Sequence, residues 1–146
     1  MKFLGSFQPL GLLALRMALG AIFLVHGYPK LTQAVGPMQT MFIQHGLPGQ
    51  LVYVAGVIET FGGLLLVVGL FARGVALILA MEMVVAIVKV HNVHGIMALH
   101  EYEFPLALAA GALALATVGA GTLSVDHVLF GEAGARRSRS TKPTKK

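Results

Sequence analysis

Ionisable residues within otherwise apolar stretches are the strongest candidates for chemistry in this sequence. Arg16, Glu59 and Glu82 each interrupt such a stretch, and Glu103 stands at the start of a fourth. A charged side chain near the centre of a bilayer costs about 3 kcal/mol or more, so such residues usually face the interior of a helix bundle. The pattern predicts that Arg16, Glu59 and Glu82 form a polar pocket inside the membrane.

Two interpretations of this trio remain open. In the first, Arg16 pairs with Glu82, or is shared between Glu82 and Glu59. These ion pairs would fix the register of the helices, because a guanidinium can bind two carboxylates in a planar fork. In the second, the trio lines a pocket that binds a small polar head group or moves protons. Two acids and one base leave a surplus negative charge, which a proton or a cation would neutralise.

A second set of polar residues is expected near the outer face of the membrane. This outer-face cluster consists of His26, Lys30, Tyr102 and Glu103. Three further histidines, His91, His94 and His100, have a spacing that zinc or copper ligands can show. Because that spacing is generic and the segment has the composition of a loop, the sequence predicts no metal site there.

The sequence contains no cysteine. This excludes disulfides, thiolate ligation of metals, iron–sulfur clusters and thiol redox chemistry by this chain alone. No cofactor is evident from the residues themselves. Any redox role would therefore use a bound cofactor or a partner protein.

The elements that must position these residues are long apolar stretches, over 10–25, 51–71, 75–90 and 104–123. At about 16–21 residues, each is long enough to cross a hydrocarbon core as a helix. Of the whole chain, 56% is hydrophobic and 12% is charged, about half the charged share of soluble proteins. The sequence predicts an all-α, polytopic membrane protein. Its four-transmembrane-helix bundle is expected to fill residues 1–131, with helices at about 10–27, 51–71, 75–91 and 103–123.

On each of the four predicted helices, a charged residue shares its face with small residues. Residues three or four apart lie on one face of a helix, and small residues let membrane helices approach closely. Each charge is therefore expected to face the bundle. The four stripes are Arg16, Gly20, Phe23 and Gly27; Val52, Gly56, Glu59 and Gly63; Glu82, Ala86 and Lys89; and Glu103, Ala107, Ala110, Ala114, Thr117 and Gly121.

Lysine and arginine positions predict the orientation. Lys2, Arg73 and the six basic residues of 132–146 would lie on one side, with only Lys30 and Lys89 on the other. Positive residues mark the cytoplasmic side, so both termini are predicted to be cytoplasmic, with Arg73 and Asp126 at the inner face. Residues 132–146 are expected to be a disordered basic tail. The tail lacks the aromatic residues typical of single-strand binding, so no nucleic-acid partner is expected.

The order of these residues resembles the DoxX family of small bacterial membrane proteins over about residues 10–130. The resemblance begins with the run Leu15-Arg16-Met17-Ala18-Leu19-Gly20 and continues through Phe23-Leu24-Val25-His26-Gly27 and Lys30. The remaining matching elements are Glu59, Gly62-Gly63, Gly69, Arg73, Tyr102-Glu103, Gly119-Ala120-Gly121 and Ser124-Val125-Asp126.

The resemblance implies a four-helix protein of the bacterial inner membrane. Some members of the family are linked to quinone chemistry, as the membrane part of thiosulfate:quinone oxidoreductases, or to oxidative-stress complexes with soluble redox enzymes. We therefore expect an accessory subunit of quinone or redox-stress metabolism that holds a quinone in its polar pocket and receives electrons from a soluble or membrane redox partner. The family provides no agreed catalytic residues to carry over.

Two other classes of function fit the same residues. A small proton-coupled transporter would depend on an intramembrane carboxylate such as Glu59. A scaffold without chemistry would recruit cytoplasmic proteins through its tail. In any of these classes, small-residue stripes that are not needed for packing within the bundle would be available for a homodimer.

Overall fold

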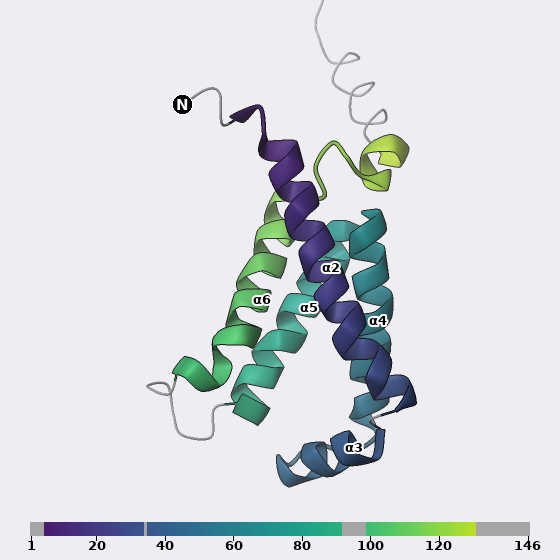
Figure 1. Ribbon diagram of the computed structural model, residues 1–146, viewed down its shortest axis with the longest axis vertical. Coiled ribbons are helices and arrows are strands. Elements are labelled where there is room, and N and C mark those ends of the chain that lie inside the picture. The colour runs from purple at the N-terminus through teal and green to yellow at the C-terminus, as the bar shows by residue number, and fades with distance from the viewer. Residues whose placement is uncertain (1–4, 34, 92–98, 131–146) are drawn as a thin grey trace, which may run out of the picture.

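The computed structural model describes residues 5–33, 35–91 and 99–130, and these residues form helices and no strands. The order is α2 (Gln8–Thr32), α3 (Val35–Gln44), α4 (Leu51–Val68), α5 (Ala72–Ala86) and α6 (Leu99–Val118). The π-helix η1 (Ile87–His91) continues α5 directly, so one helical segment runs from Ala72 to His91. The helices α2, α4, α5 and α6 form the bundle, with α3 lying across one end of it (Figure 1). The predicted all-α fold is confirmed.

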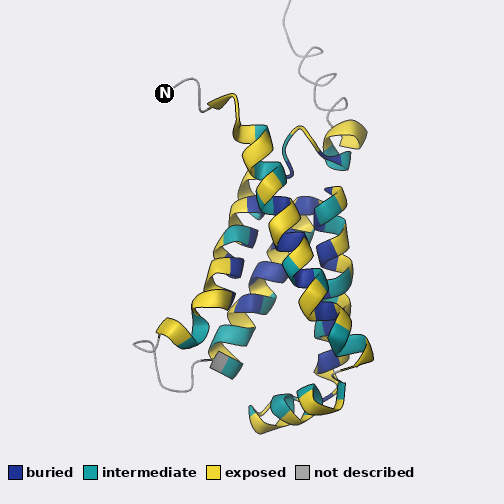
Figure 2. Cartoon of the chain, in the orientation of Figure 1, coloured by how far each residue is buried: buried dark blue, intermediate teal, exposed yellow. Residues whose placement is uncertain are grey.

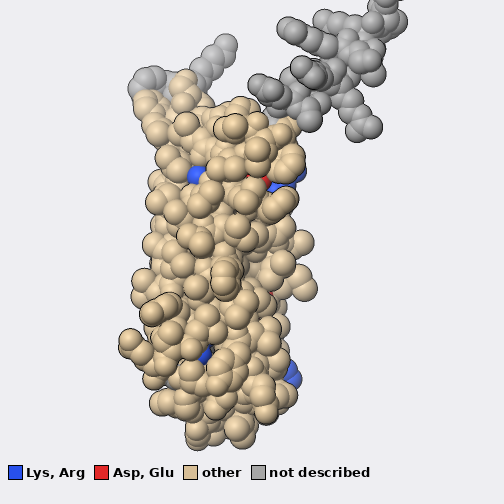
Figure 3. Space-filling view, turned by 90° about the vertical axis from the view of Figure 1, so that its right-hand side faces the viewer, with Lys and Arg blue, Asp and Glu red and all other residues tan. Residues whose placement is uncertain are grey.

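The bundle is a membrane domain. Helices α2, α4 and α6 are each long and apolar enough to cross a bilayer, and α5 with η1 runs beside them. On the face shown in Figure 3, lysine, arginine and acidic side chains appear only near the two ends. Large apolar side chains such as Phe61 and Leu64 are at least half exposed, which a lipid environment allows and water would not. The protein is thus a polytopic membrane protein.

The bundle is built from two antiparallel hairpins. The most extensive helix contacts are those of α2 with α4 and of α5 with α6. The buried faces meet along the inside of the bundle (Figure 2), where Phe23, Leu66, Leu79 and Leu115 are among the largest buried side chains. Because α2 and α6 share few contacts, the two hairpins are less tightly joined on that side.

Glycines bring α2 and α4 into backbone contact. A Cβ atom added at Gly20 would lie 2.7 Å from the carbonyl oxygen of Gly63, and one at Gly27 would lie 2.6 Å from the backbone nitrogen of Thr60. Neither position can hold a side chain unless the helices move apart. Every residue of the predicted stripes on these two helices is buried, so this part of the prediction is confirmed.

The predicted stripe on α6 faces outward instead. Glu103, Ala107, Ala110, Ala114 and Thr117 are exposed, so Glu103 does not face the bundle as predicted. The buried face of α6 is the neighbouring row of Leu108, Ala109, Ala112 and Leu115. In lipid, both leucine and alanine can lie on the outside of a bundle without an energetic penalty, because lipid tails are as apolar as these side chains. Residue size therefore could not decide which face of this uniformly apolar helix turns inward.

Five helix ends differ from the sequence prediction by three residues or more. Helix α4 ends at Val68, α5 begins at Ala72 and α6 begins at Leu99, against predicted positions of about 71, 75 and 103. Helix α2 continues past Gly27 and Pro29 to Thr32, which adds more than one turn. Helix α6 ends at Val118 rather than near residue 123, because Gly119 and Gly121 adopt positive φ angles of 98° and 79°. Left-handed glycines commonly terminate helices. Residues 125–130 then form a short final helical turn, and the predicted tail at 132–146 lies outside the described residues.

Candidate functional site

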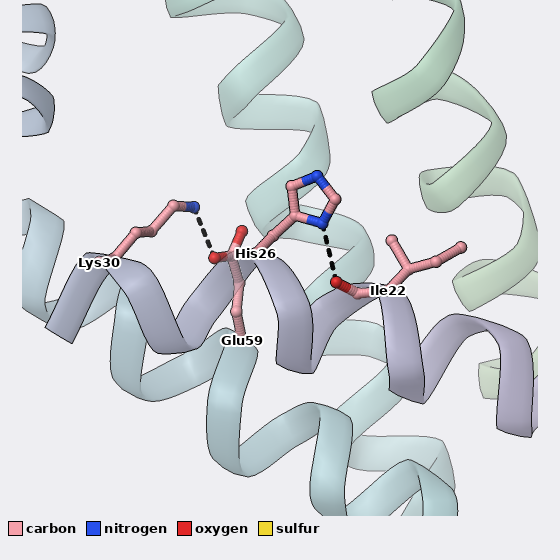
Figure 4. Close-up of polar contacts among 4 residues, drawn as sticks. All are labelled: Ile22, His26, Lys30 and Glu59. Atoms are coloured by element: carbon pink, nitrogen blue, oxygen red, sulfur yellow. Dashed lines mark hydrogen bonds and ion pairs between the residues drawn. The ribbon is translucent and has the colours of Figure 1, made fainter. Parts of the chain in front are cut away.

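An ion pair joins the two helices of the first hairpin inside the bundle. Lys30 Nζ of α2 donates to Glu59 Oε2 of α4 at 2.5 Å, and Glu59 is 3% exposed. Figure 4 shows the lysine side chain extending from the last turns of α2 toward the carboxylate. A glycine is needed beside the pair, because a Cβ atom at Gly56 would lie 3.0 Å from Lys30 Cβ. Lys30 thus compensates the buried charge of Glu59.

A cavity of about 260 Å³ lies next to this ion pair, between the two hairpins. It is located where α2 and α4 diverge from α5 and α6 (Figure 1). All four long helices contribute to its lining, which is mostly apolar. The lining residues are Ile22, Phe23, His26 and Lys30 of α2, Glu59 of α4, Met83 and Ala86 of α5, and Phe104, Pro105 and Leu108 of α6. We call this space the interhelical cavity.

His26 stands at the rim of the interhelical cavity. Its Nδ1 lies 2.8 Å from the carbonyl oxygen of Ile22 (Figure 4). A carbonyl only accepts hydrogen bonds, so Nδ1 carries the hydrogen and Nε2 is free to accept a proton. The imidazole also packs against Phe104 of α6, with ring centroids 5.5 Å apart. His26 and Phe104 therefore span the weakly joined side between α2 and α6.

Glu82 of α5 lies at the same height as Glu59 on α4. The register of these antiparallel helices is set by Gly62, whose added Cβ atom would lie 3.2 Å from Leu79. Moving three residues along each helix from this contact brings Glu59 opposite Glu82. Glu82 also interacts electrostatically with both Glu59 and Lys30. Its neighbours Met83 and Ala86 line the interhelical cavity and Glu82 does not, so it lies beside the cavity.

Arg16 lies far from the two glutamates. It is 2% exposed, and its guanidinium donates to the carbonyl oxygens of Ala120 at 2.8 Å, Leu123 at 3.0 Å and Val67 at 3.4 Å. At 1.5 Å per residue, Arg16 is about 20 Å along α2 from Lys30. The predicted pairing of Arg16 with Glu82 or Glu59 is therefore wrong. Carbonyl oxygens at the end of α4 and beyond the end of α6, which have no partner within their helices, accept the hydrogen bonds of Arg16 instead of the predicted carboxylates.

The predicted inner-face residues Arg73 and Asp126 lie at this same end of the bundle, which we call the Arg16 end. The Asp126 carboxylate accepts hydrogen bonds from the backbone nitrogens of Phe71 at 2.7 Å and Ala72 at 2.9 Å, where α5 begins. Arg73 donates to the carbonyl oxygen of Val118 at 3.2 Å. These contacts tie the segment after α6 to the turn between α4 and α5.

A second, wider groove of about 740 Å³ also lies at the Arg16 end. Its polar side chains include Arg73 and Asp126, which already bond to the backbone. The interhelical cavity is the smaller space, but it holds Lys30 and Glu59 within the span of the membrane helices. It is therefore the better candidate for a site.

The remaining predicted site residues are less closely connected with the cavity. Within the outer-face cluster, His26 and Lys30 line the interhelical cavity, whereas Tyr102 and Glu103 of the first turns of α6 do not. His100 is exposed in the first turn of α6. His94 lies outside the described residues and the side chain of His91 is not described, so the spacing of these histidines stays a sequence observation.

Sequence reasoning missed the apolar residues that shape the cavity, such as Met83, Phe104 and Pro105, because an apolar lining carries no pattern of its own. It also placed Lys30 and Glu59 in separate clusters. One signal could have joined them. Gly27 on one helix contacts Glu59 and Thr60 on the next, and Gly56 contacts Lys30 and Leu31, so the glycine spacing of the two helices brings Lys30 close to Glu59.

Comparisons with known proteins agree with this architecture. The sequence model of the DoxX family matches residues 11–92, which include α2, α4, α5 and η1. The chain is 35% identical over 125 residues to "Putative oxidoreductase CatD" of Bacillus subtilis (strain 168), covering 86% of this chain and 90% of that protein. It is also 34% identical over 91 residues to an uncharacterized protein of Haemophilus influenzae, covering 62% of this chain and 66% of that protein.

No solved structure matches the chain. The similarity to the Bacillus subtilis protein extends over nearly the whole bundle and not over one helix pair alone. Taken with the family match and the apolar helices, these findings assign the protein: it belongs to the DoxX family of membrane proteins.

Proposed function

We propose that this protein is an accessory membrane subunit of quinone or redox-stress metabolism, and that the interhelical cavity binds the quinone head group. One observation carries the proposal. A mostly apolar cavity inside a membrane bundle holds an ion pair, Lys30–Glu59, and a histidine at its rim. Pockets that combine apolar walls with a few convergent polar groups are the usual form of small-molecule sites.

The residues fit the chemistry of a quinone ring. The ring has two flat apolar faces, which Phe23, Met83 and Leu108 would contact, and two carbonyl oxygens, which need hydrogen-bond donors. Lys30 supplies such a donor, and His26 supplies one when Nε2 is protonated. At about 260 Å³, the cavity is slightly smaller than the roughly 300–1,000 Å³ of sites for drug-sized ligands. That size suits a single ring whose isoprenoid tail leaves toward lipid between α2 and α6.

Reduction of a quinone to a quinol adds two electrons and two protons. In this proposal a soluble or membrane redox partner supplies the electrons. His26 and the Lys30–Glu59 pair exchange the protons, because imidazole and carboxylate are groups that commonly act as general acids and bases. The name of the Bacillus subtilis relative, "Putative oxidoreductase CatD", supports a redox role here.

The proposed location is the bacterial inner membrane with both termini in the cytoplasm. Lys2, Arg73 and the basic residues of 132–146 lie toward one side in the sequence prediction, and positive residues favour the cytoplasm. The Arg16 end then faces the cytoplasm, and the interhelical cavity lies nearer the outer leaflet.

The proposal is tested by mass spectrometry of quinones that copurify with the protein in mild detergent. We expect stoichiometric quinone in the natural sequence and its loss in His26→Gln and in the double variant Lys30→Met/Glu59→Gln. The double variant removes both charges together, so neither is left buried alone. A matched control, His127→Gln at the Arg16 end, is expected to retain quinone. If all four proteins carry only bulk phospholipid, the quinone proposal is wrong.

A further inference from the structure

We propose that Glu82 is a proton-exchange residue that passes a proton to and from the Lys30–Glu59 pair across the contact between α4 and α5. Only the purpose of that proton, namely the reduction or oxidation of a quinone, rests on the function proposed above. The exchange itself is argued from the burial and position of Glu82, and it gives this residue a role separate from ligand contact.

The first observation is that both carboxyl oxygens of Glu82 are buried without a hydrogen-bond partner among the residues that the structure describes. Buried polar groups in folded proteins are nearly always hydrogen-bonded, and an exception calls for an explanation. Glu59 has its partner in Lys30, and the two terminal nitrogens of Arg16 donate to three carbonyl oxygens. Arg16 Nε and Thr60 Oγ1 are also buried without a partner, but Glu82 is the acidic side chain among the described residues for which this holds at both oxygens. Within membrane helices, an ionisable side chain left in this way indicates a functional site.

The second observation is the position of Glu82 relative to the ion pair. The Gly62–Leu79 contact places Glu82 at about the same height as Glu59, about one helical turn away from that contact on each helix. The charged groups that act on Glu82 are Glu59 from α4 and Lys30 from α2. From α6, the cavity-lining residues Phe104, Pro105 and Leu108 are apolar. On its own helical segment, Lys89 lies about two turns further along.

The third observation is that Glu82 lies beside the interhelical cavity and not in its lining. A proton on Glu82 can therefore be held without blocking the ligand. In the exchange, the Glu82 carboxyl gives its proton to a bridging water molecule, which passes a proton to the Glu59 carboxylate, because Glu82 makes no hydrogen bond to Glu59 itself. Glu82 becomes a carboxylate, Glu59 becomes a carboxyl, and the total charge of Lys30, Glu59 and Glu82 is unchanged by this step. A quinone oxygen that takes the proton from Glu59 leaves Glu82 as a carboxylate, which water then reprotonates.

The proposal is tested by infrared difference spectroscopy of the full chain in detergent, without added quinone, as the pH is changed. A protonated carboxyl has a C=O stretching band that shifts in D₂O, and this band reports the protonation of an acidic side chain. We expect a pH-dependent band that disappears in Glu82→Gln and moves in Glu82→Asp. The control Glu101→Gln, in the first turn of α6, is expected to leave the band unchanged. A band that persists unaltered in Glu82→Gln, or no such band at any pH, would overturn the proposal.

A second measurement separates this proposal from the quinone proposal. A short-tailed ubiquinone analogue is added to each protein in weakly buffered detergent with a pH-sensitive dye, and proton uptake on chemical reduction is recorded. We expect Glu82→Gln to bind the analogue but to take up protons at least tenfold more slowly than the natural sequence. Uptake at an unchanged rate overturns the role of Glu82. Failure of the natural sequence to bind the analogue counts against the quinone proposal alone, and the infrared band still decides the role of Glu82.

Discussion

Lys30 Nζ and Glu59 Oε2 are 2.5 Å apart within the bundle, and this contact links the last turns of α2 to the middle of α4. Glu59 is 3% exposed and the Lys30 side chain 15% exposed. Removing one partner of such a pair leaves an uncompensated charge in an apolar environment. Removing both need not be costly, because the expense of burying the charges disappears as well.

The first prediction concerns this ion pair. Lys30→Met is expected to destabilise the protein by about 3–5 kcal/mol, because it leaves the Glu59 carboxylate buried alone. The double variant Lys30→Met/Glu59→Gln is expected to recover most of that loss. Thermal unfolding in detergent, followed by circular dichroism, measures both. A double variant that is less stable than Lys30→Met would show that the pair is not an isolated unit.

The second prediction concerns the close contact between α2 and α4. Gly27→Ala is expected to destabilise the bundle by about 1–3 kcal/mol, because the new Cβ atom would lie 2.6 Å from the Thr60 nitrogen and 2.7 Å from Glu59 Cβ. The control is Gly11→Ala on the same helix, where nothing lies within 4 Å of the added atom. Gly11→Ala should keep or raise stability, by at most about 1 kcal/mol. Equal losses in the two variants would contradict the packing described here.

The third prediction concerns Arg16. Arg16→Lys is expected to cost about 1.5–3 kcal/mol of stability, since one ammonium group cannot reach the Ala120, Leu123 and Val67 carbonyl oxygens together. Because Arg16 is distant from the interhelical cavity, the quinone content of the folded variant should equal that of the natural sequence. Loss of quinone from folded Arg16→Lys protein would contradict this and show that Arg16 takes part in quinone binding.

The fourth prediction concerns Asp126. Its carboxylate accepts from the Phe71 and Ala72 nitrogens, which the start of α5 leaves without partners in its own helix. Asp126→Ala is expected to speed hydrogen exchange at these two amides by at least tenfold, whereas Asp126→Asn, which keeps one acceptor oxygen, should show a smaller effect. Hydrogen exchange followed by mass spectrometry measures this, with the amides near Glu59 as an internal reference. Uniform acceleration across the bundle would indicate global destabilisation instead.

The fifth prediction tests the homodimer expected from the sequence. The exposed row on α6 contains Ala107, Ala110 and Ala114, whose small size would permit close pairing with a second copy. The chain has no cysteine, so any disulfide between two copies must join the single introduced cysteines. Ala110→Cys in membranes is expected to give a disulfide-linked dimer on oxidation, and Leu64→Cys on the exposed face of α4 is not. Absence of the dimer from Ala110→Cys would rule out pairing through this row.

The sequence predicted the helices, the membrane setting and the buried faces of α2 and α4, because these depend on local composition and on the spacing of glycines. It could not predict the partners of Arg16. The opposite charges nearest in the sequence pattern are Glu59 and Glu82, whereas the actual partners are backbone carbonyl oxygens in the last turn of α4 and beyond the end of α6, which have no signature in side-chain type.

The contact of Lys30 with Glu59 could not be predicted for a related reason. Gly27 and Pro29 usually mark the end of a helix, so the first helix was predicted to stop at about residue 27. The structure continues α2 to Thr32, and the additional turn brings Lys30 to Glu59. Long-range packing against α4, rather than local propensity, decides this end of the helix.

The π-helix η1, over Ile87–His91, also has a consequence for chain length within the family. A π-helical turn holds more residues than an α-helical turn, so η1 accommodates an additional residue without breaking the helix. Deleting one residue there would restore α-helical winding with little net rotation, because one π-helical turn differs from one α-helical turn by about one residue, and Glu82 and Met83 would keep their places. We therefore expect the family to tolerate a length difference of one residue at this point, and a single alignment gap after Ala86 would record a change of helix type.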